Sequence, residues 1–185
     1  LSLPFGGLPL AIKELEPVEG WPFTEASLVY RDRVADHDER DEHGPDDYWA
    51  AWQDAFEAIW RGQAENDGFN RLVLSAGLDW REISLVRCYA KYLQQLGLPF
   101  SQDYMEDVLV AHARLVGLLA EQFEAMFDPA LARAQRTRRL NAVMPSIRRE
   151  VGKARNVDED RILNAFAGAF NATLRTNYYL PGDFD

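Results

Sequence analysis

Cysteine and lysine are both scarce in this 185-residue sequence: Cys88 is the only cysteine, and Lys13, Lys91 and Lys153 are the only lysines. A single cysteine excludes an intramolecular disulfide and a cysteine-rich zinc site. We predict that Cys88 is buried as a small apolar side chain, because it falls in a helical pattern of apolar residues. So few lysines leave little scope for a lysine-centred imine mechanism, and none of the three lies in a glycine-rich loop.

Long apolar runs and surplus positive charge are absent as well. No segment approaches 18 consecutive apolar residues, and the N-terminal residues lack the basic and apolar runs of a signal peptide. The sequence therefore predicts a cytoplasmic protein without a membrane partner. Lys and Arg number 20 against 30 Asp and Glu, a net charge of −10. That balance argues against nucleic acid as the partner of the whole chain, because binding to phosphates requires an excess of cations.

Motifs that carry chemistry are also missing. The sequence has no glycine-rich turn of the G-x-G-x-x-G or P-loop type and no alternation of strands with helices. The chain alone is therefore not expected to bind a nicotinamide cofactor, and we predict no catalytic, cofactor-binding or metal residues in it. His112 lies in an apolar helical stretch with no partner nearby in sequence, which favours a partly buried structural histidine over a catalytic one.

One acidic stretch offers a metal hypothesis. Seven acids and one arginine fall between Ala35 and Asp47, and such a block is typical of a solvated loop. Histidines and acids alternate within it and are of the types that ligate divalent metals. The solvated loop remains the favoured interpretation over a metal site formed by His37, Glu39, Asp41 and His43.

What the sequence does contain is a strong helical pattern. Hydrophobic residues make up 47% of the chain, with five Trp and ten Phe, which is enough for a core. From Gly44 onward, apolar residues recur at spacings of three and four, the period of an amphipathic helix. The sequence predicts a mainly α fold of about six or seven helices with a small β-containing N-terminal segment. The predicted organisation is a β-leaning segment at 1–34, an acidic loop at 35–47, a helical domain at 48–179 and a tail at 180–185.

Local signals place the ends of these helices. Gly62 is suited to end a Trp-rich helix, and Asn66 or Asp67 to cap the next one. Pro145 lacks an amide donor and is expected to kink or split a helix. Other boundaries or breaks are predicted at Gly77, Asp79 with Glu82, Gly97, Ser101, His112, Asp128 with Pro129, and Asp158.

Basic residues gather in one region, where Glu150 is the only acid. A solvated helix face that meets an acidic surface is favoured over a contact with nucleic acid. The stretch "YLQQLGLPFSQDYMEDVLV" has helix-turn-helix spacing, but acids at the start of its second helix would repel phosphates. The basic residues of the 133–155 segment are Arg133, Arg136, Arg138, Arg139, Arg148, Arg149, Lys153 and Arg155.

Several stretches together resemble the central helical region of the large, multidomain bacterial NAD-specific glutamate dehydrogenases. The blocks "WRGQAENDGFNRLVL" and "ATLRTNYY" are the most specific, and "EQFEAMFDPALA" lies between them. The similarity runs from about Asp47 to Tyr179. The acidic stretch from Asp36 to Asp47 and Pro145 do not match the family pattern.

The resemblance implies a role for the chain within a larger enzyme. In that family this region follows ACT-like regulatory domains, of which residues 1–34 would be the tail, and precedes the catalytic domain. The parent enzyme would convert L-glutamate, NAD and water to 2-oxoglutarate, ammonium and NADH. Because the family's catalytic segments lie downstream of "LRTNYY", the chain alone is expected to be inactive and to connect or regulate. Its implied partners are the rest of the parent chain and other copies in a homo-oligomer.

A second hypothesis treats the chain as a stand-alone helical interaction protein. In that interpretation the basic 133–155 helix docks an acidic partner or nucleic acid.

Overall fold

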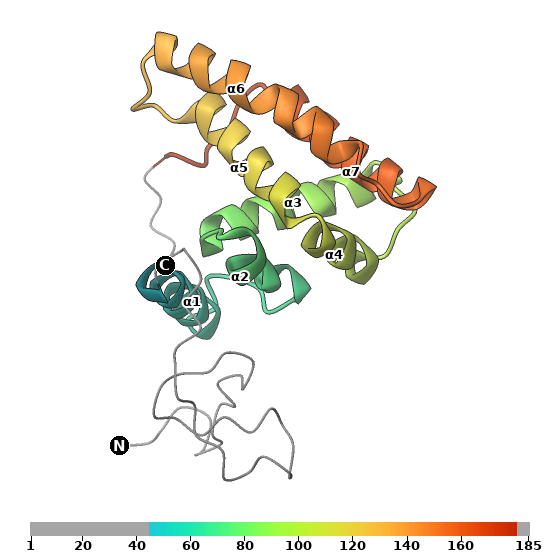
Figure 1. Ribbon diagram of the computed structural model, residues 1–185. Helices are drawn as coiled ribbons and strands as arrows, with labels where there is room; N and C mark the ends of the chain where they lie inside the picture. Colours follow the sequence, from blue (N-terminus) through green and yellow to red (C-terminus); the bar gives the residue numbers. More distant parts are fainter. Residues whose placement is uncertain (1–44, 181–185) are drawn as a thin grey trace, which may run out of the picture. The chain divides into compact units, whose positions relative to one another are not determined.

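The computed structural model describes residues 45–180, and in this part of the chain it contains seven α-helices, one short 3₁₀ helix and no strand (Figure 1). The predicted mainly α fold with six or seven helices is confirmed. The predicted β-leaning segment and residues 35–44 of the acidic loop lie outside the described residues. The elements are α1 (Pro45–Trp60), η2 (Gly68–Arg71), α2 (Leu72–Ala76), α3 (Trp80–Gln95), α4 (Gln102–Ala111), α5 (Ala113–Phe127), α6 (Arg133–Val151) and α7 (Val157–Ala172).

Helix α5 lies at the centre of the fold and contacts α2, α4, α6 and α7. In Figure 1, α5 and α6 run side by side along most of their length. The apolar residues of α5 recur at helical spacing, so one broad stripe of the helix is buried. Each fully buried large side chain contributes about 1.5–3 kcal/mol to folding. Core side chains less than 2% exposed include Phe69, Leu72, Ile83, Met105, Leu109, Leu115, Leu119, Ile162, Leu163, Phe166 and Phe170.

An aromatic seam joins three helices to the segment that follows α7. Phe170 stacks on Tyr89 of α3, with 4.0 Å between ring centroids, and meets Phe123 of α5 edge-on at 6.3 Å. Tyr178 packs edge-on against Phe123 at 5.4 Å. The "ATLRTNYY" block thus returns the chain from α7 to the surfaces of α3 and α5.

Most predicted helix boundaries are confirmed. Gly62 and Gly77 adopt left-handed conformations, with φ of 73° and 67°, which end α1 and α2. The Asp79 carboxylate accepts a hydrogen bond from the Glu82 amide at 2.8 Å, and the Asp79 amide donates to Glu82 at 2.9 Å. This is the reciprocal capping box that the sequence predicts. The break at His112 is also present, between α4 and α5.

Two boundary predictions in the C-terminal half are wrong. Helix α6 begins at Arg133 rather than at Asp128, whose backbone ends α5. The N-cap of α7 is Asn156 rather than Asp158; the Asn156 side chain accepts from the Glu159 amide at 2.8 Å. At Pro145 the sequence predicts a kink or a split, and α6 continues through this residue without splitting.

Three aromatic residues of α1 form a stripe along the helix. The ring of Phe56 stacks between those of Trp52 and Trp60, at centroid distances of 5.6 and 6.4 Å. None of the helices in residues 45–180 has both the length and the apolar character needed to cross a bilayer.

Candidate functional site

Arg87 of α3 is a deeply buried charged residue, only 4% exposed. Its Nε donates to Oδ2 of Asp67 at 2.6 Å, and its Nη2 donates to Oδ1 of the same carboxylate at 2.8 Å. Nη2 also reaches the backbone carbonyl of Glu65 at 3.2 Å and Oδ1 of Asn70 at 3.0 Å. This bidentate pair compensates the cost of burying the guanidinium. The loop between α1 and η2 is therefore fixed to α3.

A second set of contacts tightens the same loop. Gln102 of α4 donates to the Asp67 carboxylate at 3.3 Å and to Glu106 at 2.8 Å. A Cβ added to Gly68 would lie 2.1 Å from Oε2 of Glu106, which is itself 5% exposed. Asp67 additionally accepts from the Phe69 amide at 3.1 Å. The polar segment between Trp60 and Phe69 therefore forms a turn between α1 and η2, and several of its polar groups make contacts within the fold.

A second buried polar cluster surrounds Glu159 at the start of α7. Its Oε2 lies 3.1 Å from Nε2 of His112 and accepts from the Arg155 amide at 2.8 Å. The Arg155 guanidinium lies 2.8 Å from Oε1. Hydrogen bonds from the Arg155 side chain, followed by that from its amide, lower the pKa of Glu159 to about 2. His112 is 10% exposed at its side chain, which confirms a partly buried, partnered histidine.

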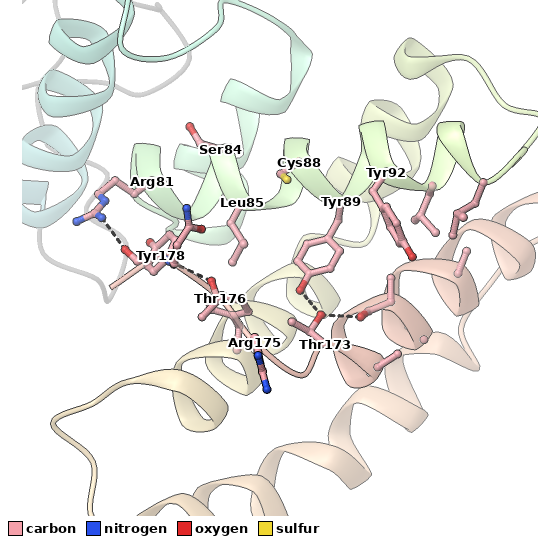
Figure 2. Close-up of a pocket in the computed structure, with 18 of the residues that line it drawn as sticks. Arg81, Ser84, Leu85, Cys88, Tyr89, Tyr92, Thr173, Arg175, Thr176 and Tyr178 are labelled. Atoms are coloured by element: carbon pink, nitrogen blue, oxygen red, sulfur yellow. Dashed lines mark hydrogen bonds between the residues drawn. The ribbon is translucent and has the colours of Figure 1, made fainter. Parts of the chain in front are cut away.

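A groove of about 910 Å³ is bounded by α3, α7 and residues 173–178. Figure 2 shows Leu85, Tyr89 and Tyr92 extending from α3 toward the opposite wall. The Tyr89 hydroxyl meets Oγ1 of Thr173 at 2.5 Å, and burial raises the pKa of Tyr89. Near the other end, Nη2 of Arg81 donates to the backbone carbonyl of Tyr178 at 2.9 Å. This groove is the main candidate site for a binding partner.

Cys88 lines this groove and is exposed, so the prediction that it is buried is wrong. The core-facing arc of α3 contains Ile83, Val86 and Ala90. Cys88 is five positions after Ile83, and five residues turn the helix by about 140°. It therefore belongs to a second apolar face of α3, which no described element covers.

A smaller hollow of about 330 Å³ is lined by four carboxylates from α3 and α5 and their flanking residues. Burial, followed by the charges of Asp79 and Glu124, raises the pKa of Glu82. Even so, residues 45–180 contain no group of three or more His, Cys, Asp and Glu side chains arranged to hold a metal ion. The alternating residues His37, Glu39, Asp41 and His43 lie outside the described part. The four carboxylates of the hollow are Asp79, Glu82, Glu124 and Asp128.

Much of the basic cluster on and after α6 serves internal contacts. Arg136 donates to the backbone carbonyls of Met126 at 2.6 Å, Asp128 at 2.6 Å and Leu131 at 3.2 Å, and so caps the C-terminal end of α5. Arg139 pairs with Glu124 at 2.8 Å. The exposed arginines of α6 whose side chains pair with no other described residue are Arg133, Arg138 and Arg148.

Two of the three lysines also make contacts within the described part. Lys91 pairs with Glu65, and Lys153 with Glu150 at 2.7 Å, while Lys13 lies outside the described residues. Gln102, which begins the second helix of the helix-turn-helix-like stretch, belongs to the Arg87 network.

Sequence reasoning missed Arg87 and Gln122, which are buried polar residues. Gln122 in α5 is 1% exposed; its Nε2 reaches Oδ1 of Asn171 at 3.4 Å, and its Oε1 has no partner within the described residues. A signal for Arg87 was present, because it lies in register with Ile83, Val86 and Ala90 on the core-facing arc.

Comparisons with known proteins agree with this architecture. A family model described as "Glutamate dehydrogenase, helical motif 3" matches residues 64–129. NAD-specific glutamate dehydrogenase of Mycobacterium tuberculosis is 44% identical over 127 residues, 69% of this chain. The enzymes of that name from Pseudomonas aeruginosa and Halomonas elongata are 40% and 38% identical over 70% and 68% of the chain. No solved structure matches this chain.

The matched segment is a small part of each relative. This chain spans only 8% of the length of each of these three proteins. The family match begins inside the loop fixed by Arg87 and ends just after α5, so it covers η2, α2, α3, α4 and α5. The chain is therefore a relative of one helical segment of the large NAD-specific glutamate dehydrogenases, the segment that contains their helical motif 3.

Proposed function

We propose that this chain is a non-catalytic connecting and regulatory module of an NAD-dependent glutamate dehydrogenase. The parent would oxidise L-glutamate to 2-oxoglutarate and ammonium, with NAD as the hydride acceptor bound elsewhere in the polypeptide. Its partners would be the other domains of the parent chain and further copies in a homo-oligomer. A cytoplasmic location, without membrane or nucleic-acid partners, belongs to the same proposal.

This role is supported by the buried ionisable groups, which form contacts between helices and loops of the fold. Arg87 holds a loop through Asp67, and Glu159 joins the start of α7 to the break at His112. Both clusters fix the positions of helices relative to one another, which is what a connecting element needs in order to transmit a displacement. Regulation would additionally require two arrangements of the module that ligands elsewhere favour differently.

The first test compares the isolated chain with the complete natural polypeptide that contains it. We expect the complete polypeptide to produce NADH from glutamate and NAD, and the folded chain of residues 1–185 to produce none. Production is measured at 340 nm, and circular dichroism confirms that the chain is helical. Glutamate-dependent NADH formation by the isolated chain would refute the non-catalytic role.

A second candidate function rests on the exposed face of α6. Arg138 and Arg148 are exposed there about 80° apart around the helix, in a chain of net charge −10. Such a face would suit an acidic protein surface or a polyanion, because clustered arginines raise the local potential.

Heparin chromatography tests this candidate. If α6 binds polyanions, Arg138→Glu with Arg148→Glu should abolish salt-sensitive retention while leaving the helical content unchanged. The matched control is Arg139→Glu with Arg71→Glu, because these arginines already pair with Glu124 and Asp107. Equal retention of both variants would rule out a specific role for the exposed face.

A further inference from the structure

The two long walls of the groove differ in side-chain size. On α7 the lining residues follow one another at steps of three, one and three, which places them on one helix face. They are all small: Ala165, Gly168, Ala169 and Ala172. The opposing residues, from α3 and its C-cap, are large: Leu85, Tyr89, Tyr92 and Leu96. A groove with one shallow wall and one deep apolar wall allows the backbone of a further helix to approach closely.

The groove is also nearly free of charge. Charged residues make up 27% of the chain, yet only two of them line the groove, and both are arginines, Arg81 and Arg175. Tyr92 and Leu96 at its edge are 48% and 64% exposed. Contiguous apolar surface with so little charge is characteristic of a face that another protein element covers.

We propose that this groove docks an amphipathic helix from elsewhere in the polypeptide that contains this chain. The inference rests on the proposed function, since only a module of a longer chain has such a partner. The docking helix places an apolar face between α3 and α7, and an acidic side chain near Arg175. Arg175 is exposed, and its side chain has no hydrogen-bond or ion-pair partner among residues 45–180.

The length of the related proteins and the net charge of this chain both favour a helix of the same polypeptide over a second copy of the chain as the occupant of the groove. The chain spans 8% of each relative, so most of the polypeptide in those proteins lies outside the matched segment and is tethered to it. Tethering gives a weakly binding helix a high effective concentration at the groove. A second copy would instead bring another net charge of −10 toward the first, which opposes association.

Cys88 provides the measurement, because it is exposed in the groove and is the only cysteine of the chain. The rate of its alkylation by iodoacetamide is followed by mass spectrometry of the peptide that contains it, in the isolated chain and in the complete polypeptide. We expect alkylation to be roughly tenfold or more slower in the complete polypeptide, because the docked helix must leave before the reagent enters. Introducing Ser75→Cys, at an exposed position outside the groove, provides the reference rate in both proteins.

Two variants then test the occupant. At Gly168 an added Cβ meets nothing within 4 Å, so Gly168→Trp can place its ring in the groove. In the complete polypeptide we expect this variant to restore Cys88 alkylation to within about twofold of the isolated chain that carries the same substitution. Asn164→Trp, at an exposed position of α7 outside the groove, should leave Cys88 protected. Arg175→Glu should accelerate alkylation in the complete polypeptide and leave the isolated chain unchanged.

Several outcomes would overturn the proposal. Equal Cys88 rates in the two proteins would show that the groove is uncovered. Alkylation of the isolated chain that slows as its concentration rises would identify a second copy as the occupant. Protection of Cys88 that survives Gly168→Trp would place the protecting segment outside the groove. None of these readouts depends on NADH production, so failure of the docking proposal is distinguishable from failure of the proposed function.

Discussion

Replacing Arg87 with methionine is expected to destabilise the chain by about 3–5 kcal/mol, the usual cost of removing one partner from a buried ion pair. The substitution keeps an unbranched apolar stem but leaves the Asp67 carboxylate unpaired at 13% side-chain exposure. The amide oxygen of Asn70 loses its Arg87 donor at the same time, and the backbone carbonyl of Glu65 keeps only the donor from Asn70 Nδ2. Urea denaturation followed by circular dichroism measures the difference in free energy of unfolding.

The matched control is Arg139→Met. Arg139 also approaches a carboxylate, Glu124, at 2.8 Å, but both side chains are more than 40% exposed. Exposed pairs contribute about 0–1 kcal/mol, so the control should lose little. If Arg87→Met lowered the free energy of unfolding by no more than Arg139→Met does, the contacts of Arg87 would not be what fixes the loop between α1 and η2. Combining Asp67→Asn with Arg87→Met should cost less than the two single changes summed, because the pair acts as one unit.

The elements that could be predicted from the sequence are those specified by neighbouring residues. Asp79 and Glu82 are three positions apart and form the capping box of α3, and Gly62 ends α1 in a left-handed conformation. Caps of this kind depend on local backbone geometry and side-chain chemistry. The number of helices follows from the same local signals together with the spacing of apolar residues.

What could not be predicted are the pairs that only the tertiary fold brings together. Arg87 and Asp67 are 20 residues apart, and His112 and Glu159 are 47 apart. No periodicity connects such residues, because their meeting depends on how separate helices pack. The start of α6 follows the same rule, since Arg136 reaches back to backbone carbonyls between Met126 and Leu131 and so fixes the turn between α5 and α6.

Two further differences between sequence and structure concern which face of a helix meets solvent. Pro145 is exposed, and so is Asn141, whose carbonyl would otherwise accept a hydrogen bond from the amide at position 145. Water can satisfy that carbonyl, so the lost hydrogen bond does not require α6 to split at the proline. Cys88 is exposed because α3 carries two apolar faces, one toward the core and one toward the groove. The sequence of α3 does not indicate which of these two faces is buried by the rest of the chain.

Glu159→Gln is the second change with a large expected effect. The glutamate side chain accepts hydrogen bonds from the Arg155 amide and guanidinium and faces His112, at 5% exposure. A glutamine of the same size carries no charge and turns one of its two oxygens into a donor. Bonds to a charged group contribute about 1.5–3 kcal/mol, and we expect a loss of that size at pH 7. The reference is Asp158→Asn in the same helical turn, which should lose only the interaction with the helix dipole, about 0.3–1 kcal/mol.

The loss should depend on pH in a defined direction. In the folded chain the pKa of Glu159 is about 2, below the ordinary value of 4.5. A carboxyl with a depressed pKa binds its proton more readily in the unfolded state, so its stabilisation is complete above pH 4.5 and disappears as the pH falls toward 2. The difference in free energy of unfolding between the natural chain and Glu159→Gln should therefore stay constant from pH 7 to about 5 and shrink below that. The other carboxyl groups titrate in both proteins, so their contributions to the free energy of unfolding cancel in this difference. If the difference persisted unchanged to pH 2, glutamine would destabilise this position through its shape rather than through the lost charge. The contacts among His112, Glu159 and Arg155 would then stabilise the fold by packing rather than by electrostatic attraction.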